Sequence, residues 1–376
     1  MNGSVLVCLD KFRGCLTAAQ ACAAVAAGVE AAGGRAVAMP VADGGEGTLA
    51  ALAGAGYREV WVEVTGPTGR PVRAAFAVRG SRAVIEMAQA SGLDVLPGGV
   101  AAPLVADSHG TGELIRAALD HGCLDIVLAV GGSATTDGGA GLLRALGARI
   151  TDSRGAPVGP GGAALTGAAN VDLSTLDFRL RLARVTLVSD VDNPLTGPSG
   201  AAAVFGPQKG ASPRDVEVLE RGLRQFAEVV AAEIGGDFRE SPGAGAAGGT
   251  GFAALAALGA RRVSGAEFVL GEAGVEQALR AASLVVVGEG RFDEQSLRGK
   301  APVGVASAAR RHGVPVVVVA GDVRLSAARM REVGVVAAWS LLERAGGLDA
   351  SISRAPALLT EIGRELPAVA ARGGAA

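Results

Sequence analysis

Lysine is rare in this chain. Of its 35 basic residues only three are lysine, namely Lys11, Lys209 and Lys300. Arginine is a planar fork and lysine a compact point charge, so the two are not interchangeable where the geometry of the charge matters. All three lysines stand in short segments flanked by glycine or proline, a common way to hold a phosphate group. One such lysine alone is better explained as a solvated loop residue, but the three together favour anion binding.

Polar residues set among glycines follow each apolar run that is typical of a buried parallel strand. These segments are 10–13, 42–48, 131–139, 189–194 and 288–296. Ligands of open parallel sheets bind beyond the carboxyl ends of the strands. The pattern therefore predicts that these loops meet at one edge of the protein and form a ligand site there.

The loop 131–139 is the most suggestive of these segments, because it joins an apolar run to a helix-like segment. Its backbone N–H groups and the helix dipole can face an anion. Gly131 and Gly132 let the backbone approach phosphate oxygens, and hydroxyl groups add donors. Those hydroxyl groups belong to Ser133, Thr135 and Thr136. The last acid of the loop, Asp137, is compatible with metal binding and, at least equally, with capping the helix.

Other carboxylates in these loops also admit two interpretations. Asp43 and Glu46 suit Mg²⁺, which prefers one or two carboxylates together with phosphate oxygens. They equally suit a helix start, where acids are favoured. The pair Asp293 and Glu294 faces the same choice. Asp190 precedes Asn193-Pro194 and, taken alone, is typical of a turn.

The elements that must position these loops alternate between short apolar runs and helix-like segments, which predicts a doubly wound α/β sheet. Residues 58–95 alternate instead with a period of two around a Gly-Pro-Thr-Gly turn, as antiparallel strands do. We therefore expect two domains. Residues 1–57, 96–149 and 281–376 are predicted to form the first, and 58–95 and 150–280 an inserted second α/β domain.

Composition excludes several classes of function. The net charge is −2, aromatic residues are 3% of the chain, and no basic block occurs, so no nucleic-acid partner is expected. The apolar stretches are too short to span a membrane, and no signal peptide is apparent, so no membrane partner is expected. Four cysteines without a Cys-x-x-Cys pair favour a cytoplasmic protein with free thiols.

Two nucleotide-binding motifs were also considered. No Gly-x-x-x-x-Gly-Lys-Ser/Thr segment exists, which excludes a P-loop enzyme. Residues 243–248 fit Gly-x-Gly-x-x-Gly, but no strand is predicted before them, as a dinucleotide fingerprint requires.

The loops resemble those of a known family, the bacterial glycerate kinases that are unrelated to P-loop kinases. The matching segments are 10–14, 40–48, 85–92, 110–114, 131–141, 190–195, 205–211, 242–249 and 288–295. They occur in order and with matching spacing between about residues 4 and 325. The family often has lysine where this chain has Arg13, and serine near Cys15.

The resemblance implies a flavodoxin-like domain joined to a second, mixed-sheet α/β domain. It also implies ATP- and Mg²⁺-dependent phosphorylation of D-glycerate, with 2-phosphoglycerate favoured over 3-phosphoglycerate. Phosphoryl transfer then consists mostly of positioning and charge stabilisation. Whether the protein is a monomer or a homodimer stays open.

Roles for the candidate residues follow from that chemistry. Lys209 or Lys11 would neutralise phosphate charge, and Asp190 and Asp293 would bind Mg²⁺ or accept the substrate's hydroxyl proton. Arg13 or Arg291 would bind the glycerate carboxylate. Substrate binding is also expected from Asn193, phosphate binding from Gly131, Gly132, Ser133, Thr135, Thr136 and Lys300, and metal binding from Asp43, Glu46 and Asp137.

Two rival functions were weighed. A nicotinamide-dependent oxidoreductase can use the same type of sheet, but the misplaced glycine motif disfavours it. A non-catalytic sensor of glycerate or nucleotide is disfavoured by the many carboxylates and lysines around the presumed site.

Overall fold

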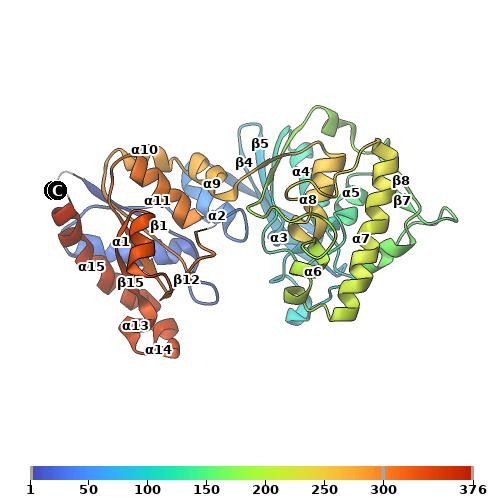
Figure 1. The fold of residues 1–376 in the computed structure, drawn as a ribbon. Coiled ribbons are helices and arrows are strands. Elements are labelled where there is room, and N and C mark those ends of the chain that lie inside the picture. Colours follow the sequence, from blue (N-terminus) through green and yellow to red (C-terminus); the bar gives the residue numbers. More distant parts are fainter. Residues whose placement is uncertain (1–2, 298–300, 374–376) are drawn as a thin grey trace. The chain divides into compact units, whose positions relative to one another are not determined.

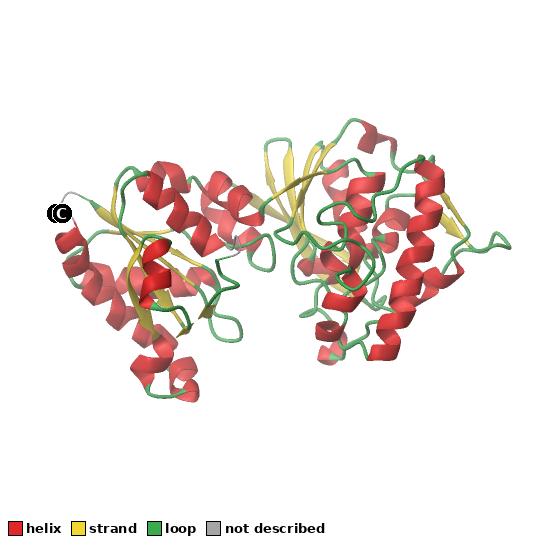
Figure 2. Cartoon of the chain, in the orientation of Figure 1, coloured by secondary structure: helices red, strands yellow, loops and turns green. Residues whose placement is uncertain are grey.

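The computed structural model describes residues 3–297 and 301–373 and divides into two compact units (Figure 1). Unit 1 comprises residues 1–43, 50–56 and 264–376, and unit 2 comprises residues 44–49 and 57–263. Unit 2 is thus inserted into the chain of unit 1. Each unit is an α/β structure with its own sheet between helices (Figure 2).

Unit 1 contains a five-stranded sheet in which all pairings are parallel. Its strands are β2 (Ala36–Ala38), β1 (Ser4–Leu9), β11 (Ala282–Gly288), β13 (Val316–Ala320) and β15 (Val335–Ser340), in that spatial order. Numbered along the chain, this order is 2-1-3-4-5, which is the flavodoxin-like arrangement. The two-stranded pair β12 (Arg291–Phe292) and β14 (Asp322–Val323) follows the ends of β11 and β13.

Both faces of this sheet are covered, as the apolar strands require. Val5 and Val7 of β1 share a core with α1 and α15, whereas Leu6 and Cys8 share the opposite core with α9 and α11. The helices of this unit are α1 (Ala18–Ala31), α9 (Gly265–Ala273), α10 (Val275–Leu279), α11 (Ala301–Arg311), α12 (Ala327–Glu332), α13 (Leu341–Ala345), α14 (Leu348–Ser353) and α15 (Ala355–Gly373). The short α2 (Thr48–Leu52) joins the two units along the chain.

Unit 2 contains a six-stranded mixed sheet. Its spatial order is β10 (Arg261–Val263), β9 (Arg184–Val188), β6 (Asp125–Ala129), β5 (Arg82–Glu86), β4 (Pro71–Arg79) and β3 (Arg58–Thr65). The first four strands are parallel, and the β3–β4 and β4–β5 pairs are antiparallel. The antiparallel segment predicted from the alternating pattern is confirmed. The strands β7 (Arg149–Thr151) and β8 (Asn170–Asp172) form a separate two-stranded antiparallel sheet.

Six helices belong wholly to unit 2, among the described residues. They are α3 (Ala88–Ser91), α4 (His109–Asp120), α5 (Ala140–Ala145), α6 (Ala201–Phe205), α7 (Pro213–Ile234) and α8 (Ala246–Ala257). The longest, α7, begins after Ser212, whose hydroxyl accepts the Asp215 N–H, and ends at Gly235 in the left-handed region. These start and stop signals define the ends of the helix.

The predicted domain boundaries are wrong in several places. Residues 44–49 were expected in the first domain and 264–280 in the second, but 44–49 belong to unit 2 and 264–280 to unit 1. Residues 96–149 were expected in the first domain, but β6 pairs with β5 and β9 in the sheet of unit 2. An apolar run such as Ile126–Val130 shows that a strand is buried, and it carries no signal for which of two sheets buries it. The loops were expected at one edge, yet 131–139 and 189–194 follow strands of a different sheet from 10–13 and 288–296.

No described helix is long and apolar enough to cross a membrane.

Candidate active site

Unit 1 gathers carboxylates at the ends of neighbouring strands. Asp10 follows β1 directly, is 6% exposed, and its N–H donates to the Gly288 carbonyl of β11 at 2.9 Å. Burial, and then the charges of Asp43 and Glu289, raise the pKa of Asp10 from 3.8 to about 7. The Lys11 N–H donates to Asp10 Oδ1 at 2.6 Å and partly offsets this shift. A cation bound here would relieve the repulsion.

These carboxylates fit a magnesium ion whose remaining ligands come from a substrate and water. No group of three or more His, Cys, Asp or Glu side chains with metal-binding geometry occurs among the described residues. Of the residues predicted to bind a metal, Asp43 belongs to unit 1, and Glu46 and Asp137 belong to unit 2. Mg²⁺ needs only one or two carboxylates, with phosphate oxygens and water as its other ligands. Asp10 and Asp43 supply donors of the required kind.

Two predicted arginines of unit 1 lie on the loops that follow β1 and β11. Arg13 and Arg291 are both exposed and line one pocket together. The Arg291 Nε lies 3.9 Å from Asp322 Oδ2, a loose ion pair. Their guanidinium groups are accessible to an anion.

Asp293 stabilises a turn. Its Oδ1 accepts N–H groups from Gln295 at 2.8 Å and Ser296 at 3.4 Å, and its own N–H donates to the Ser296 hydroxyl at 3.1 Å. The turn interpretation accounts for these contacts, so we do not assign Asp293 to catalysis. Lys300 lies outside the described residues.

Lys209 is the central charge of unit 2. It ends a short 3₁₀ turn (Pro207–Lys209) and is 3% exposed. Its Nζ donates to the Ser133 hydroxyl at 3.0 Å and to the Thr135 carbonyl, so it lies against the loop that follows β6. Burial lowers the pKa of Lys209 from 10.5 to about 7, and Asp137 opposes that shift. An anion at this loop would stabilise the ammonium form.

The glycines of the 131–139 loop serve close packing as well as any ligand. A Cβ on Gly131 would lie 2.5 Å from the Gly45 Cα, and the Gly131 N–H donates to the Gly44 carbonyl at 3.2 Å. Gly132 differs, because it is exposed, has φ +77°, and its nearest neighbour to an added Cβ is 3.3 Å away. Of the loop's first two glycines, Gly132 is the one that offers an open backbone to a ligand.

The second half of the same loop is buried. Thr135 and Thr136 are both 0% exposed, so their hydroxyl groups do not reach the surface as the phosphate prediction requires. Asp137 is also 0% exposed, and its carboxylate accepts N–H groups from Ser108, Gly139 and Gly141, together with the Ser108 hydroxyl. These contacts support helix capping at α5 rather than metal binding, because the oxygens are already engaged.

Asp190 is half-buried at the carboxyl end of β9, beside the end of β6. The loop after it is fixed by Arg262, whose Nη1 donates to the carbonyls of Ser189 and Val191 at 3.2 Å each. Asn193 donates its amide to the Ser199 carbonyl at 2.8 Å, so it stabilises a turn. Of the predicted residues in this segment, Asp190 keeps the position expected of a catalytic carboxylate.

The glycine-rich segment that leads into the first turn of α8 (residues 243–249) holds both of these loops in place. A Cβ on Gly248 would lie 2.0 Å from the Thr135 carbonyl oxygen, and one on Gly245 would lie 2.2 Å from the Pro194 carbonyl oxygen. The Gly248 carbonyl also accepts the Gly138 N–H at 2.9 Å. The segment follows α7 without an intervening described strand, so its Gly-x-Gly-x-x-Gly match is a packing device and not a dinucleotide loop.

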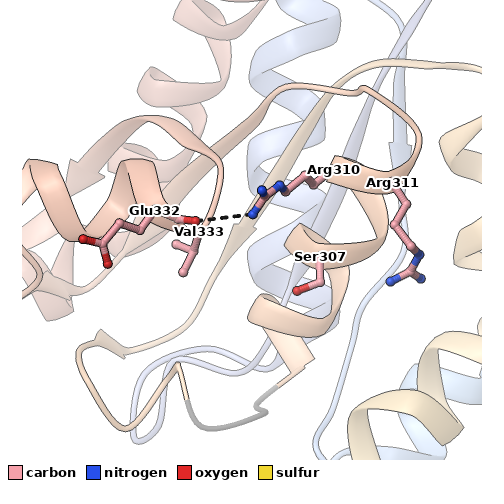
Figure 3. A pocket seen from close by; sticks show the side chains of 5 residues that line it. All are labelled: Ser307, Arg310, Arg311, Glu332 and Val333. Atoms are coloured by element: carbon pink, nitrogen blue, oxygen red, sulfur yellow. Dashed lines mark hydrogen bonds between the residues drawn. The ribbon is translucent and has the colours of Figure 1, made fainter.

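A hollow of about 470 Å³ between α11 and α12 contains none of the predicted residues (Figure 3). Arg310 bridges it by donating to the Glu332 carbonyl at 3.5 Å. It carries no carboxylate cluster or glycine-rich loop, and we do not assign it to the site.

Sequence reasoning missed three buried carboxylates. Asp10 and Glu289 each directly follow a strand, a signal that was present but was overlooked in favour of the neighbouring lysine and arginine. Glu86 is 1% exposed and accepts the N–H groups of Gly47 at 3.2 Å and Leu49 at 3.0 Å. It stabilises the start of α2, the role considered for Asp43 and Glu46, and no local signal in the sequence indicates that contact.

Comparisons with known proteins identify the family of the chain. Residues 5–371 match the model of the glycerate kinase family. The chain is 42% identical to a glycerate kinase of Bacillus subtilis over 369 residues, which cover 97% of each chain. It is 42% identical to the glycerate 2-kinase of Escherichia coli over 342 residues, 90% of this chain and 89% of the relative.

A solved structure extends the likeness to the fold. A crystal structure from Salmonella typhimurium LT2, described as a glycerate kinase 2, superposes with a TM-score of 0.84 at 39% identity and covers all of both chains. Sequence and fold therefore agree: the chain belongs to the glycerate kinase family and is an enzyme that transfers a phosphoryl group to an alcohol.

Proposed function

We propose that the enzyme transfers the γ-phosphoryl group of ATP, with Mg²⁺, to the 2-hydroxyl of D-glycerate. The observation that carries this proposal is the group of carboxylates at the strand ends of unit 1, where burial and then the charges of Asp43 and Glu289 raise the pKa of Asp10 to about 7. Such a group favours a divalent cation, and a magnesium-bound triphosphate is the usual donor of kinases. The Escherichia coli relative's description as a glycerate 2-kinase supports the 2-hydroxyl.

The residues of each unit then have distinct tasks. Asp10 and Asp43 would hold Mg²⁺, which when bound neutralises charge on the phosphate oxygens. Lys11, next to Asp10, would add a positive charge for the phosphates. The raised pKa of Asp10 means that cation binding at neutral pH displaces a proton from this carboxyl.

In unit 2, Lys209 and the open backbone of Gly132 would hold an anionic oxygen of a substrate. Ser133 is 5% exposed, and its hydroxyl oxygen accepts a hydrogen bond from the Lys209 ammonium. This leaves the Ser133 hydroxyl hydrogen able to donate to the bound anion. Asp190 would accept the proton of the attacking hydroxyl as the new phosphate ester forms. The buried lysine needs no large movement to act, because its hydrogen bonds already fix it to the loop.

We also propose a cytoplasmic location, where ATP is available. All four cysteines are free thiols, which suits a reducing compartment.

The direct test is steady-state kinetics of the full chain with D-glycerate, ATP and Mg²⁺, each omitted in turn. Turnover that requires all three supports the proposal. ATP hydrolysis that is independent of glycerate, or turnover with EDTA equal to that with Mg²⁺, contradicts it.

A further inference from the structure

A second pocket, at the carboxyl edge of the unit 1 sheet, is lined by both apolar and cationic side chains. The proposed reaction assigns no ligand to its apolar part. The pocket measures about 310 Å³. Its walls come from the segments that follow β1, β11, β13 and β15, together with α14 and the start of α15. In flavodoxin-like sheets, ligands bind at this edge, near the point where the strand order reverses between the first and third strands.

One side of the pocket is apolar. Leu341 and Leu342 begin α13, and Leu348 and Ile352 belong to α14, and all four line it. Leu348 is 63% exposed and Ile352 is 47% exposed, so both present apolar surface to water. A ligand with an apolar surface would remove these side chains from water and gain about 25 cal/mol per Å² of surface covered.

The other side of the pocket is cationic. Arg13, Arg291 and Arg324 line it, with Asp322 as the one acid among its lining residues. Asp322 accepts from the Arg324 Nε at 2.6 Å and is only loosely paired with Arg291 at 3.9 Å. Arg13 and Arg291 therefore retain donors for an incoming anion, and their planar forks suit phosphate oxygens.

This combination discriminates between the two substrates of the proposed reaction. Glycerate is a small, fully polar acid that gains nothing from four aliphatic side chains. A nucleotide has a planar base that packs on an apolar wall and phosphates that arginine binds. A volume near 300 Å³ lies at the small end for ligand pockets, so it suits the base rather than a whole nucleotide.

The geometry points to this pocket as the site of the adenine base of ATP, with Arg13 and Arg291 on the phosphate side. The inference rests on the proposed function, in which ATP is the donor. It reassigns the two arginines from the glycerate carboxylate to the nucleotide. The aliphatic side chains of α13 and α14 become the residues that determine the preference for the base.

The unmodified enzyme offers a direct readout. Cys15 lines the pocket and is partly exposed, and its thiol donates to the Ile352 carbonyl at 3.4 Å, whereas Cys8, Cys22 and Cys123 are buried. Burial raises the pKa of Cys15, so alkylation by iodoacetamide is followed at alkaline pH by mass spectrometry. We expect adenosine alone, and ATP, to slow alkylation of Cys15 several-fold, and glycerate alone to leave it unchanged. Protection by glycerate but not by adenosine, or protection by neither nucleoside nor nucleotide, overturns the inference.

Variants separate this inference from the proposed reaction. Leu348→Glu and Ile352→Glu place a negative charge on the apolar wall and are expected to raise the KM for ATP at least tenfold, with the KM for glycerate unchanged. Val336→Glu is the matched control, because Val336 is 62% exposed in the same unit and does not line the pocket. Two variants are used so that the test does not depend on one of them folding, and circular dichroism checks that each variant is folded.

The outcomes are distinct. Wild-type enzyme that does not phosphorylate glycerate with ATP refutes the proposed function. Wild-type turnover with an unchanged KM for ATP in both glutamate variants, or with a raised KM for glycerate instead, refutes only the location of the base.

Discussion

The two units bury charges of opposite sign beside the carboxyl ends of their sheets. In unit 1, burial and neighbouring carboxylates raise the pKa of Asp10 to about 7. In unit 2, burial lowers the pKa of Lys209 to about 7 as well. Burial of each charge costs stability, and the favourable interactions of Asp10 with Lys11 and of Lys209 with Asp137 offset only part of that cost. The difference favours a bound cation in unit 1 and a bound anion in unit 2, which suits the proposed magnesium-dependent reaction.

The largest expected effect comes from removing the cation of unit 2. Lys209→Met keeps the length of the side chain but not its charge, and we expect kcat to fall by about 10²–10³-fold because a preorganised donor is lost. Thermal melts and circular dichroism check that the fold persists. Retention of wild-type kcat in a folded Lys209→Met protein would exclude Lys209 from the reaction.

The corresponding change in unit 1 is Asp10→Asn. It removes one proposed ligand, so we expect the Mg²⁺ concentration for half-maximal activity to rise about 10- to 100-fold. Stability is expected to increase at the same time, because repulsion with Asp43 and Glu289 is relieved. Asp94→Asn, at an exposed position, is the control. An unchanged Mg²⁺ dependence would show that unit 1 does not bind the cation through Asp10.

The arrangement of the loop 131–139 in unit 2 depends on backbone contacts that a single methyl group would disrupt. Gly248→Ala places a Cβ 2.0 Å from the Thr135 carbonyl at a φ of +66°, and we expect a loss of about 2–4 kcal/mol in the free energy of unfolding. Gly122→Ala has φ +88° but open space around the Cβ, so it should cost about 1 kcal/mol. Urea denaturation compares the two. Equal losses would mean that the close approach to Thr135 is not what requires glycine.

The pH dependence of stability sharpens the comparison further. The unfolded chain holds the Lys209 proton up to a pH near 10.5, whereas the folded chain releases it near pH 7. Between these values the unfolded state binds more protons, so this residue makes stability rise with pH and fall as pH drops towards 7. The difference between wild type and Lys209→Met should therefore change by up to about 1.4 kcal/mol per pH unit in that window. A constant difference from pH 7 to 10 would show that Lys209 keeps an ordinary pKa.

The smallest expected effect concerns Ala247, which has φ +52° and is the one non-glycine residue with positive φ in the described chain. Ala247→Gly should add about 1 kcal/mol to the free energy of unfolding, because the left-handed region strains a residue with a Cβ. Destabilisation in the same urea assay would contradict this account of the segment before α8.

Much of the fold was predictable from local patterns. The alternation in residues 58–95 predicted an antiparallel segment, and strands β3, β4 and β5 form it. The helix 213–234 likewise carries its own cap and stop signals in the sequence. The sheet to which β6 belongs was not predicted correctly, because the burial of an apolar run does not identify the strands that pair with it. Pairing across sequence decides that question, and a single chain does not display it.

The sequence predicted which loops carry the candidate site, but it did not predict what each residue in those loops does. Lys209 was singled out by its type, and its ammonium donates to the Ser133 hydroxyl; its role in anion binding stays a prediction. Asp137, Asn193 and Asp293 have side chains suited to chemistry, yet their atoms are engaged in a cap and two turns. The same residue types serve both purposes, and only the positions of their hydrogen-bond partners separate them.

The most direct test of the central claim is nuclear magnetic resonance of the product formed from D-glycerate, ATP and Mg²⁺. We expect a single phosphate ester whose phosphorus couples to the proton on carbon 2, formed at the rate at which ATP is consumed. A phosphorus coupled to the two protons on carbon 3, or consumption of ATP without any glycerate ester, would contradict it.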